Sequence, residues 1–139
     1  MAKTINQKVV FKNTTTDVLY DLYMNAKKHS MISGAPAVIS AKPGSNFSAH
    51  GGYIKGKNLH LVKDKTIVQT WRGSDWNESD PDSIFIINLE QKGKDVVLYA
   101  THSNVPDDQC EDIAQGWKDF YWNPWKQYLA GKKISQPAI

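Results

Sequence analysis

The stretch QCEDIAQGWKDFYWNPWKQYL, residues 109–129, decides the fold that we expect for this sequence. Its apolar residues recur at intervals of three and four. At about 100° per residue they occupy roughly one third of a helix circumference. They are Ile113, Trp117, Phe120, Tyr121, Pro124 and Tyr128. The spacing predicts a long amphipathic helix that buries one face.

Two features of this stretch depart from a regular helix. Pro124 removes an intrahelical hydrogen bond, so we expect a kink or a break near Asn123. Trp122 lies well away from the apolar stripe, and Trp125 lies at its border. Either these tryptophans are exposed and contact a partner, or the break at Pro124 rotates them inward.

The region before this helix has a period of two residues. Its segments are rich in β-branched and aromatic residues and are separated by turn signals, which predicts a meandering antiparallel sheet. The predicted strands cover residues 37–40, 46–50, 54–62, 66–72, 83–91 and 95–102. A further strand over 5–11 opens the chain, and two short helices are expected over 17–24 and 26–32.

This order of elements predicts an α+β fold. The amphipathic last helix is expected to lie across a strongly curved antiparallel sheet of about six to seven strands. The chain has 139 residues, which fits one domain over 1–139, with a loose tail over 135–139. A sheet that wraps around one helix often leaves a cavity between them.

Composition excludes several classes of protein. The net charge is +3, and the 17 basic residues comprise scattered lysines and one arginine, Arg72, which argues against nucleic-acid binding. No apolar run approaches the roughly 20 residues of a membrane-spanning helix, so membrane insertion is not expected. The start of the chain shows no signal-peptide core, and Cys110 is the only cysteine. Both features favour a cytoplasmic protein.

Several short stretches resemble one known family. FSAHGGYIKG at 47–56 and IVQTWR at 67–72, followed by Trp76, are similar to its signature strands. The pairs at 105–106, 116–117 and 121–122 are similar to its C-terminal helix motif. The family is that of the activator of the 90-kDa heat shock protein ATPase homologues, in its C-terminal domain. It belongs to the START-like, or SRPBCC, helix-grip superfamily that includes the birch pollen allergen.

The resemblance implies the helix-grip fold and leaves three functions open. The first is binding of an apolar small molecule, such as a lipid, between the sheet and the last helix. The second is a co-chaperone module that binds and stimulates a 90-kDa heat shock protein ATPase. The third is a cyclase or hydrolase, for which only His102 and Arg72 offer polar groups. Fold analogy alone does not decide among them. We favour the first, without catalysis, because the sequence shows no triad and no paired acids with a clear role.

The candidate ligand-binding residues are those expected to face the concave side of the sheet. They are Phe47, Trp71, Phe85, Tyr99, His102, Ile113 and Trp117. His102 shares its strand face with Val96 and Leu98, so it is either a satisfied buried histidine or a group that orients a ligand. Both faces of the 83–91 strand are apolar, so the alternation of side chains does not decide which face points inward.

The candidate partner-binding residues are Trp76 and Trp122. Trp76 lies in a polar loop, where it either caps the open end of the sheet or is exposed as an anchor. A homodimer is a further alternative. His29, His50 and His60 come from three different elements without ligand spacing, so no metal is expected. No triad or carboxylate pair appears, so neither catalytic residues nor a cofactor are expected.

Overall fold

A computed structural model describes residues 2–135 of the chain. The loose tail expected over 135–139 lies, beyond Ser135, outside the described residues. The strands are β1 (Ala2–Phe11), β2 (Asn46–Ala49), β3 (Ile54–Val62), β4 (Thr66–Gly73), β5 (Ser83–Lys92) and β6 (Asp95–Pro106). The helices are α1 (Thr16–Met24), α2 (Ala26–Ser33), η1 (His50–Gly52), η2 (Asp107–Gln109), α3 (Cys110–Trp117), η3 (Lys118–Trp122) and α4 (Asn123–Leu129).

The strands form one antiparallel sheet in the order β1-β6-β5-β4-β3-β2. Strands β2 to β6 are a meander because each pairs with the next strand along the chain, and β1 pairs with β6 at the far edge. The predicted α+β fold, with two short helices after the first strand, is confirmed. The segment 37–40 was predicted as a strand, but it makes only a single bridge, from Val38 to Ser48.

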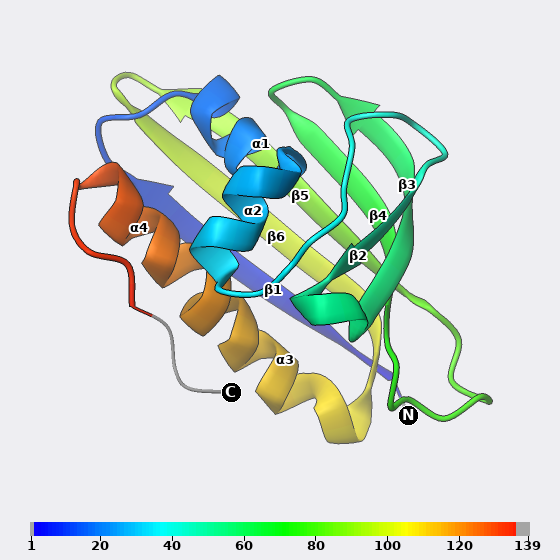
Figure 1. Cartoon of the computed structure of the whole chain (residues 1–139). Helices are drawn as coiled ribbons and strands as arrows, with labels where there is room; N and C mark the ends of the chain where they lie inside the picture. The colour runs from blue at the N-terminus through cyan, green and yellow to red at the C-terminus, as the bar shows by residue number, and fades with distance from the viewer. Residues whose placement is uncertain (1, 136–139) are drawn as a thin grey trace.

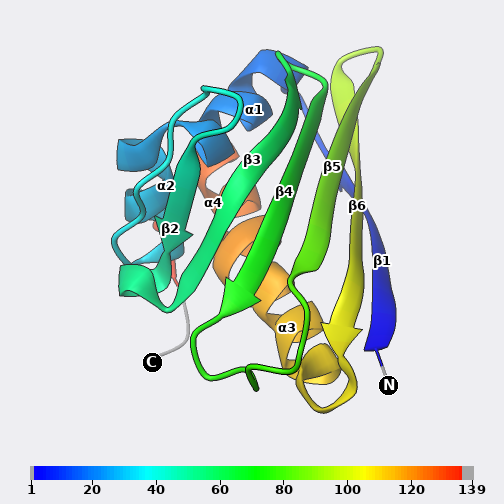
Figure 2. The same cartoon turned by 90° about the vertical axis from the view of Figure 1, so that its right-hand side faces the viewer.

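The sheet curves around the helices, which lie on its concave side (Figures 1 and 2). The C-terminal helix runs diagonally across the sheet, and α1 and α2 cover the end of the sheet near α4. None of the helices within residues 2–135 is long and apolar enough to cross a membrane.

On β4 and β6 the side chains alternate between the inner and outer faces of the sheet, as the sequence pattern predicts. Trp71 of β4 and His102 of β6 are buried, together with the residues two and four positions before each of them. On β5 the structure places Phe85 inward, with Ile87 and Leu89, and so decides which of the two apolar faces of this strand points to the core. Phe85 stacks on Trp117 of α3 with ring centroids 4.0 Å apart. The space between sheet and helix is therefore filled by aromatic side chains at this level.

The C-terminal helix continues from Asp107 to Leu129 but changes its pitch in the middle. Lys118–Trp122 forms a π turn, in which the N–H of Asn123 bonds to the carbonyl of Lys118, five residues earlier. The wider turn ends immediately before Pro124, whose missing N–H it accommodates. The helix does not break near Asn123, and the irregularity expected there takes the form of this π turn. Inward rotation of the tryptophans, the alternative to their exposure, is confirmed, because Trp122 and Trp125 are each 2% exposed.

Candidate functional site: a pocket beside the C-terminal helix

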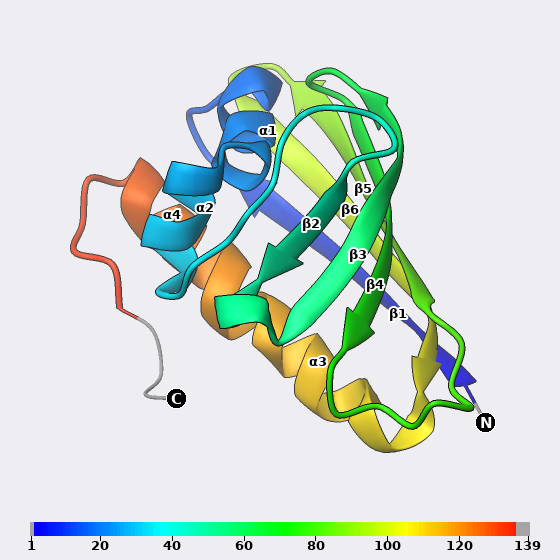
Figure 3. The same cartoon turned by 45° about the vertical axis from the view of Figure 1, so that its right-hand side comes forward.

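A hollow of about 410 Å³ lies where α3 and η3 pass the ends of β3 and β4. We call it the His50 pocket. Its lining comprises His50, Tyr53, Ile54, Trp71, Asp75, Gln109, Asp112, Ile113, Gly116, Trp117, Phe120 and Tyr121. Figure 3 shows the turn that ends β2 (η1) beside the orange part of the C-terminal helix. The pocket is thus at the open margin between sheet and helix.

The turn between β2 and β3 brings the His50 ring to the helix. His50, Gly51 and Gly52 have φ values of 52°, 67° and 94°, and successive left-handed residues reverse the chain tightly. Glycine adopts this region without strain, whereas His50 is held there by its surroundings. Its ring meets those of Phe120 and Tyr121 nearly edge-on, with centroids 5.6 and 5.7 Å apart.

A buried chain of hydrogen bonds runs from His50 into the core. Nδ1 of His29 lies 2.8 Å from the backbone carbonyl of Tyr23, which only accepts, so Nδ1 carries the proton. Nε2 of His29 therefore accepts from the Tyr121 hydroxyl, at 2.7 Å. The Tyr121 oxygen in turn lies 3.1 Å from Nε2 of His50, which is left as the donor. When both imidazoles are neutral, these contacts place the proton of His29 on Nδ1 and the proton of His50 on Nε2.

Burial keeps His29 and His50, the two histidines of this hydrogen-bond network, neutral near pH 7. It lowers the pKa of His29 to about 4, and it also lowers the pKa of His50. Burial likewise raises the pKa of the Tyr121 hydroxyl, which stays protonated. The pocket wall is therefore a rigid, uncharged network.

The rim of the pocket is polar and acidic. The Tyr53 hydroxyl donates to the Asp75 carboxylate. Burial, and then this carboxylate, raise the pKa of Tyr53 to about 12. Asp112 and Gln109 add further polar groups on the helix side, and the lining contains no lysine or arginine. The arrangement offers several hydrogen-bond acceptors around an aromatic hollow.

His102 lies deeper in the core than the His50 pocket, and its ring nitrogens are both occupied. Nε1 of Trp117 donates to Nδ1 of His102 at 3.1 Å. Nε2 therefore donates to Oγ of Ser83 at 2.7 Å, and this hydroxyl donates to the carbonyl of Trp71 at 2.7 Å. Burial lowers the pKa of His102 to about 3. The reading as a satisfied buried histidine is confirmed, and no nitrogen of this ring is left for a ligand.

The predicted ligand-binding residues fall into three groups. Trp71, Ile113 and Trp117 line the His50 pocket. Phe47, Phe85 and His102 are buried in the filled core and do not line it. Tyr99 was placed wrongly: it is 37% exposed on the opposite face of the sheet, where Lys8 Nζ lies 5.9 Å from its ring. It lies one residue from the inward-facing positions of β6, and strand alternation turns it outward.

The predicted surface anchors are also wrong, because both tryptophans are buried. Trp76 is 7% exposed; its ring packs 5.7 Å from that of Trp71, and the Arg72 guanidinium covers it. The capping role, which was the alternative, fits this position. Trp122 is packed inward by the π turn, and its Nε1 donates to Oε1 of Gln7 at 2.7 Å. Arg72, named for the enzyme hypothesis, bonds to loop carbonyls and does not reach the pocket.

Sequence reasoning missed nine of the twelve lining residues of the pocket, among them His50, Tyr53, Phe120 and Tyr121. The HGGY run at 50–53 reads as a turn, and nothing in it shows which side chain the turn points at the helix. Phe120 and Tyr121 belong to the aromatic stripe that we assigned to the core. A histidine directly before two glycines, opposite such a stripe, is the signal that could have suggested the contact.

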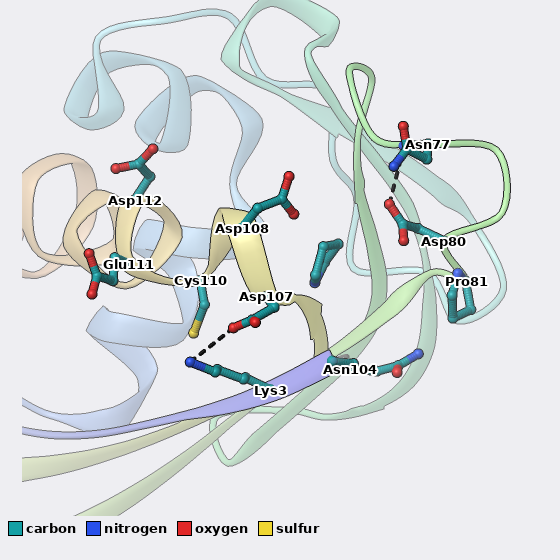
Figure 4. Close-up of a pocket in the computed structure, with 12 residues that line it drawn as sticks. Lys3, Asn77, Asp80, Pro81, Asn104, Asp107, Asp108, Cys110, Glu111 and Asp112 are labelled. Atoms are coloured by element: carbon teal, nitrogen blue, oxygen red, sulfur yellow. Dashed lines mark hydrogen bonds and ion pairs between the residues drawn. The ribbon is translucent and has the colours of Figure 1, made fainter.

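A second, larger hollow of about 890 Å³ lies at the start of the C-terminal helix (Figure 4). Lys3 of β1 pairs there with Asp107 at 2.9 Å. The carboxylates of Asp108, Glu111 and Asp112 occupy the first turns of the helix, where its dipole favours negative charge. No group of three or more potential metal ligands occurs within residues 2–135. We assign no site to this acidic groove.

A curved antiparallel sheet that grips one long C-terminal helix defines a START-like domain. Solved structures agree, among them CalU16 from Micromonospora echinospora, at a TM-score of 0.78 and 17% identity, covering 95% of this chain and 77% of that one. Residues 13–130 match the family model described as Activator of Hsp90 ATPase homolog 1-like protein. The chain belongs to this family.

Curated relatives of the same family are longer proteins. The activator of 90 kDa heat shock protein ATPase homolog of Dictyostelium discoideum is 30% identical over 117 residues, covering 84% of this chain and 30% of the relative. Homolog 1 of Homo sapiens is 27% identical over 114 residues, covering 82% and 33%. The chain thus spans about a third of the length of these relatives.

Two solved structures have nearly the same length as this chain. An HSP90 activator from Plasmodium falciparum aligns with a TM-score of 0.81 and 25% identity, covering 96% of this chain and 98% of that one. The Aha1 dimer from Colwellia psychrerythraea aligns at 0.78 and 19%, covering 91% and 96%. At that identity the second structure shows the fold alone.

Proposed function

We propose that this chain binds a small apolar molecule in the His50 pocket. The observation that carries the proposal is the lining: Ile113, Trp117 and Phe120 of the helix face Trp71 and Ile54 of the sheet. Its volume of about 410 Å³ lies within the range of roughly 300–1,000 Å³ that is typical of small-molecule sites. An aromatic hollow with a few convergent polar groups is the usual form of such a site.

The walls of the pocket are held in place before any ligand arrives. Trp117 is fixed by its hydrogen bond to His102 and its stack on Phe85. Tyr121 is fixed by two hydrogen bonds, to His29 and His50. A preorganised pocket loses little conformational entropy on binding, which favours affinity for a small ligand.

The test is an NMR titration of the protein with 2-naphthol, a small aromatic probe. We expect saturable shifts concentrated at the amides of His50, Ile113 and Phe120. Removing the ring in Phe120→Ala should weaken binding by roughly tenfold, because it takes away apolar contact area. Tyr99→Ala, on the opposite face of the sheet, is the control and should bind normally. Absent or scattered shifts would contradict the proposal.

A second candidate is binding of a 90-kDa heat shock protein-type chaperone. It is favoured by the Plasmodium falciparum structure, which is described as an HSP90 activator and of which this chain covers 98%. The test is to titrate the chain into such a chaperone and measure steady-state ATP hydrolysis. A saturable rise in the rate supports this function. An unchanged rate, without complex formation in a sedimentation experiment, argues against it.

A further inference from the structure

The polar groups of the His50 pocket select among small apolar molecules. We propose that the pocket takes a neutral or cationic aromatic molecule that donates a hydrogen bond to Nδ1 of His50, and that it rejects carboxylates. The inference rests on the proposed function of the pocket as a binding site. It specifies the class of ligand by charge and by hydrogen-bond donor.

The acceptor at His50 is set by a contact on the far side of the core. The carbonyl of Tyr23 requires a proton on Nδ1 of His29, so the single proton of the Tyr121 hydroxyl goes to Nε2 of His29. His50 must then donate to Tyr121 from its own Nε2. A neutral imidazole has one N–H, so Nδ1 of His50 carries a bare lone pair.

This lone pair is free and accessible. Among residues 2–135, no hydrogen bond joins Nδ1 of His50 to another group, and the one buried side-chain nitrogen or oxygen without a partner is Nε1 of Trp76. Nδ1 of His50 is therefore unpaired and reachable from outside, on a ring that lines the pocket. Burying it under a ligand without a donor would leave it unsatisfied, which is costly.

The charges around the pocket have one sign. Asp75 and Asp112 contribute carboxylates to the lining, and no Lys or Arg does, although the chain has 17 such residues. The Arg72 side chain is directed to the carbonyls of Asn77 and Asp80 instead. An anionic ligand would lose its hydration beside like charges and gain no counter-ion there, whereas a neutral or cationic ligand avoids this penalty.

The other polar groups on the rim point to the same preference. The Tyr53 hydroxyl uses its proton on Asp75, so it offers a ligand only its lone pairs. Nε1 of Trp117 is already engaged by His102. The amide of Gln109 and Nε1 of Trp71, which makes no hydrogen bond within residues 2–135, remain as donors in the lining. The pocket therefore presents mainly acceptors to whatever binds between its aromatic walls.

The test compares three naphthalenes that share one ring system. At pH 7, 2-naphthol is a neutral donor, 2-methoxynaphthalene is neutral without a donor, and 2-naphthoate is anionic. We expect 2-naphthol to bind about fivefold tighter than 2-methoxynaphthalene, the effect of one hydrogen bond. We expect 2-naphthoate to bind at least about tenfold weaker than 2-naphthol, because of the like charges. Dissociation constants come from calorimetry, and NMR shifts at Ile113 and Phe120 locate each probe.

Two variants separate the acceptor from the rest of the pocket. His50→Phe keeps an aromatic wall and should remove the preference for 2-naphthol over 2-methoxynaphthalene. Tyr99→Phe, on the opposite face of the sheet and outside the pocket, should retain it. Far-ultraviolet circular dichroism checks that both variants fold, and the comparison on the unchanged protein decides the question if either does not.

The outcomes distinguish this inference from the function on which it rests. Tighter binding of 2-naphthol that is lost in His50→Phe supports both. Binding of all three probes in the pocket with equal affinity, or tight binding of 2-naphthoate, overturns the inference and leaves the binding function standing. If none of the three probes binds, the proposed function fails and the inference fails with it.

Discussion

Gly56 of β3 lies where two neighbouring strands leave no room for a side chain. A Cβ at this position would lie 1.9 Å from the carbonyl oxygen of Thr70 and 2.6 Å from a ring carbon of Phe47. Backbone atoms of a paired strand do not give way easily. We expect Gly56→Ala to lower the free energy of unfolding by about 3 kcal/mol, as measured by urea denaturation.

Gly116 is the matched control on the helix. A Cβ there meets nothing within 4 Å, and its φ is not in the left-handed region. Alanine is a better helix former than glycine, so Gly116→Ala should raise the free energy of unfolding by about 1 kcal/mol. If the two substitutions had equal effects, the close approach of β3 and β4 at Gly56 would be wrong.

At the scale of the helix, the π turn decides which tryptophans support the fold. In a regular α-helix Trp122 would project away from the apolar stripe and its removal would cost little. The structure instead buries its ring against Trp117, with centroids 5.6 Å apart, and bonds its Nε1 to Gln7 of β1. We therefore expect Trp122→Ala to lower the free energy of unfolding by about 4 kcal/mol in denaturant titrations.

Lys126 provides the comparison on the same helix. Its side chain is exposed, so Lys126→Ala should change the free energy of unfolding by less than about 0.5 kcal/mol. A small effect of Trp122→Ala, similar to that of Lys126→Ala, would mean that the helix keeps its regular pitch through 118–122.

The same helix shows what the sequence can predict and where it stops. Its length and buried face follow from apolar residues at helical spacing, and the faces of β4 and β6 follow from alternation. A count at 3.6 residues per turn does not contain the extra residue of a π turn, so it places Trp122 outside. Similarly, the position of Trp76 depends on how its loop folds back onto Trp71, which no local pattern encodes.

The candidate site was predicted in part for a related reason. Trp71, Ile113 and Trp117 were placed correctly because each belongs to a periodic element. The pocket itself depends on the left-handed turn at His50, which directs one ring to the helix across a sequence separation of about 70 residues. Such a contact arises from the packing of whole elements, and local residue preferences do not determine it.

At the scale of the whole molecule, two buried histidines join the layers. His29 connects α2 to η3 through Tyr121, and His102 connects β5 and β6 to α3 through Ser83 and Trp117. Both are neutral in the folded protein, because burial holds the pKa of His29 at about 4 and that of His102 at about 3. In the unfolded chain each returns to the ordinary histidine pKa of about 6.5.

This difference makes stability depend on pH in a defined direction. Between pH 6.5 and the folded pKa values the unfolded chain binds more protons than the folded one, so stability falls as pH falls. Each histidine should cost about 2 kcal/mol at pH 5 relative to its neutral form. A hydrogen bond from the Asn13 backbone lowers the pKa of Asp95, and one from Lys3 lowers the pKa of Asp107, so these two carboxylates contribute at lower pH.

We therefore expect the free energy of unfolding to be lower at pH 5 than at pH 7 by at least about 4 kcal/mol, as measured by urea denaturation at both pH values, since the lowered pKa of His50 adds a contribution of the same sign. His102→Gln should remove about 2 kcal/mol of this difference, whatever its effect at pH 7, because the variant has one buried histidine fewer. His60 is exposed, so His60→Gln should leave the difference unchanged. An undiminished pH dependence in His102→Gln would show that this ring takes up a proton as readily in the folded protein as in the unfolded chain, and the hydrogen bond from Trp117 to its Nδ1 would then be wrong.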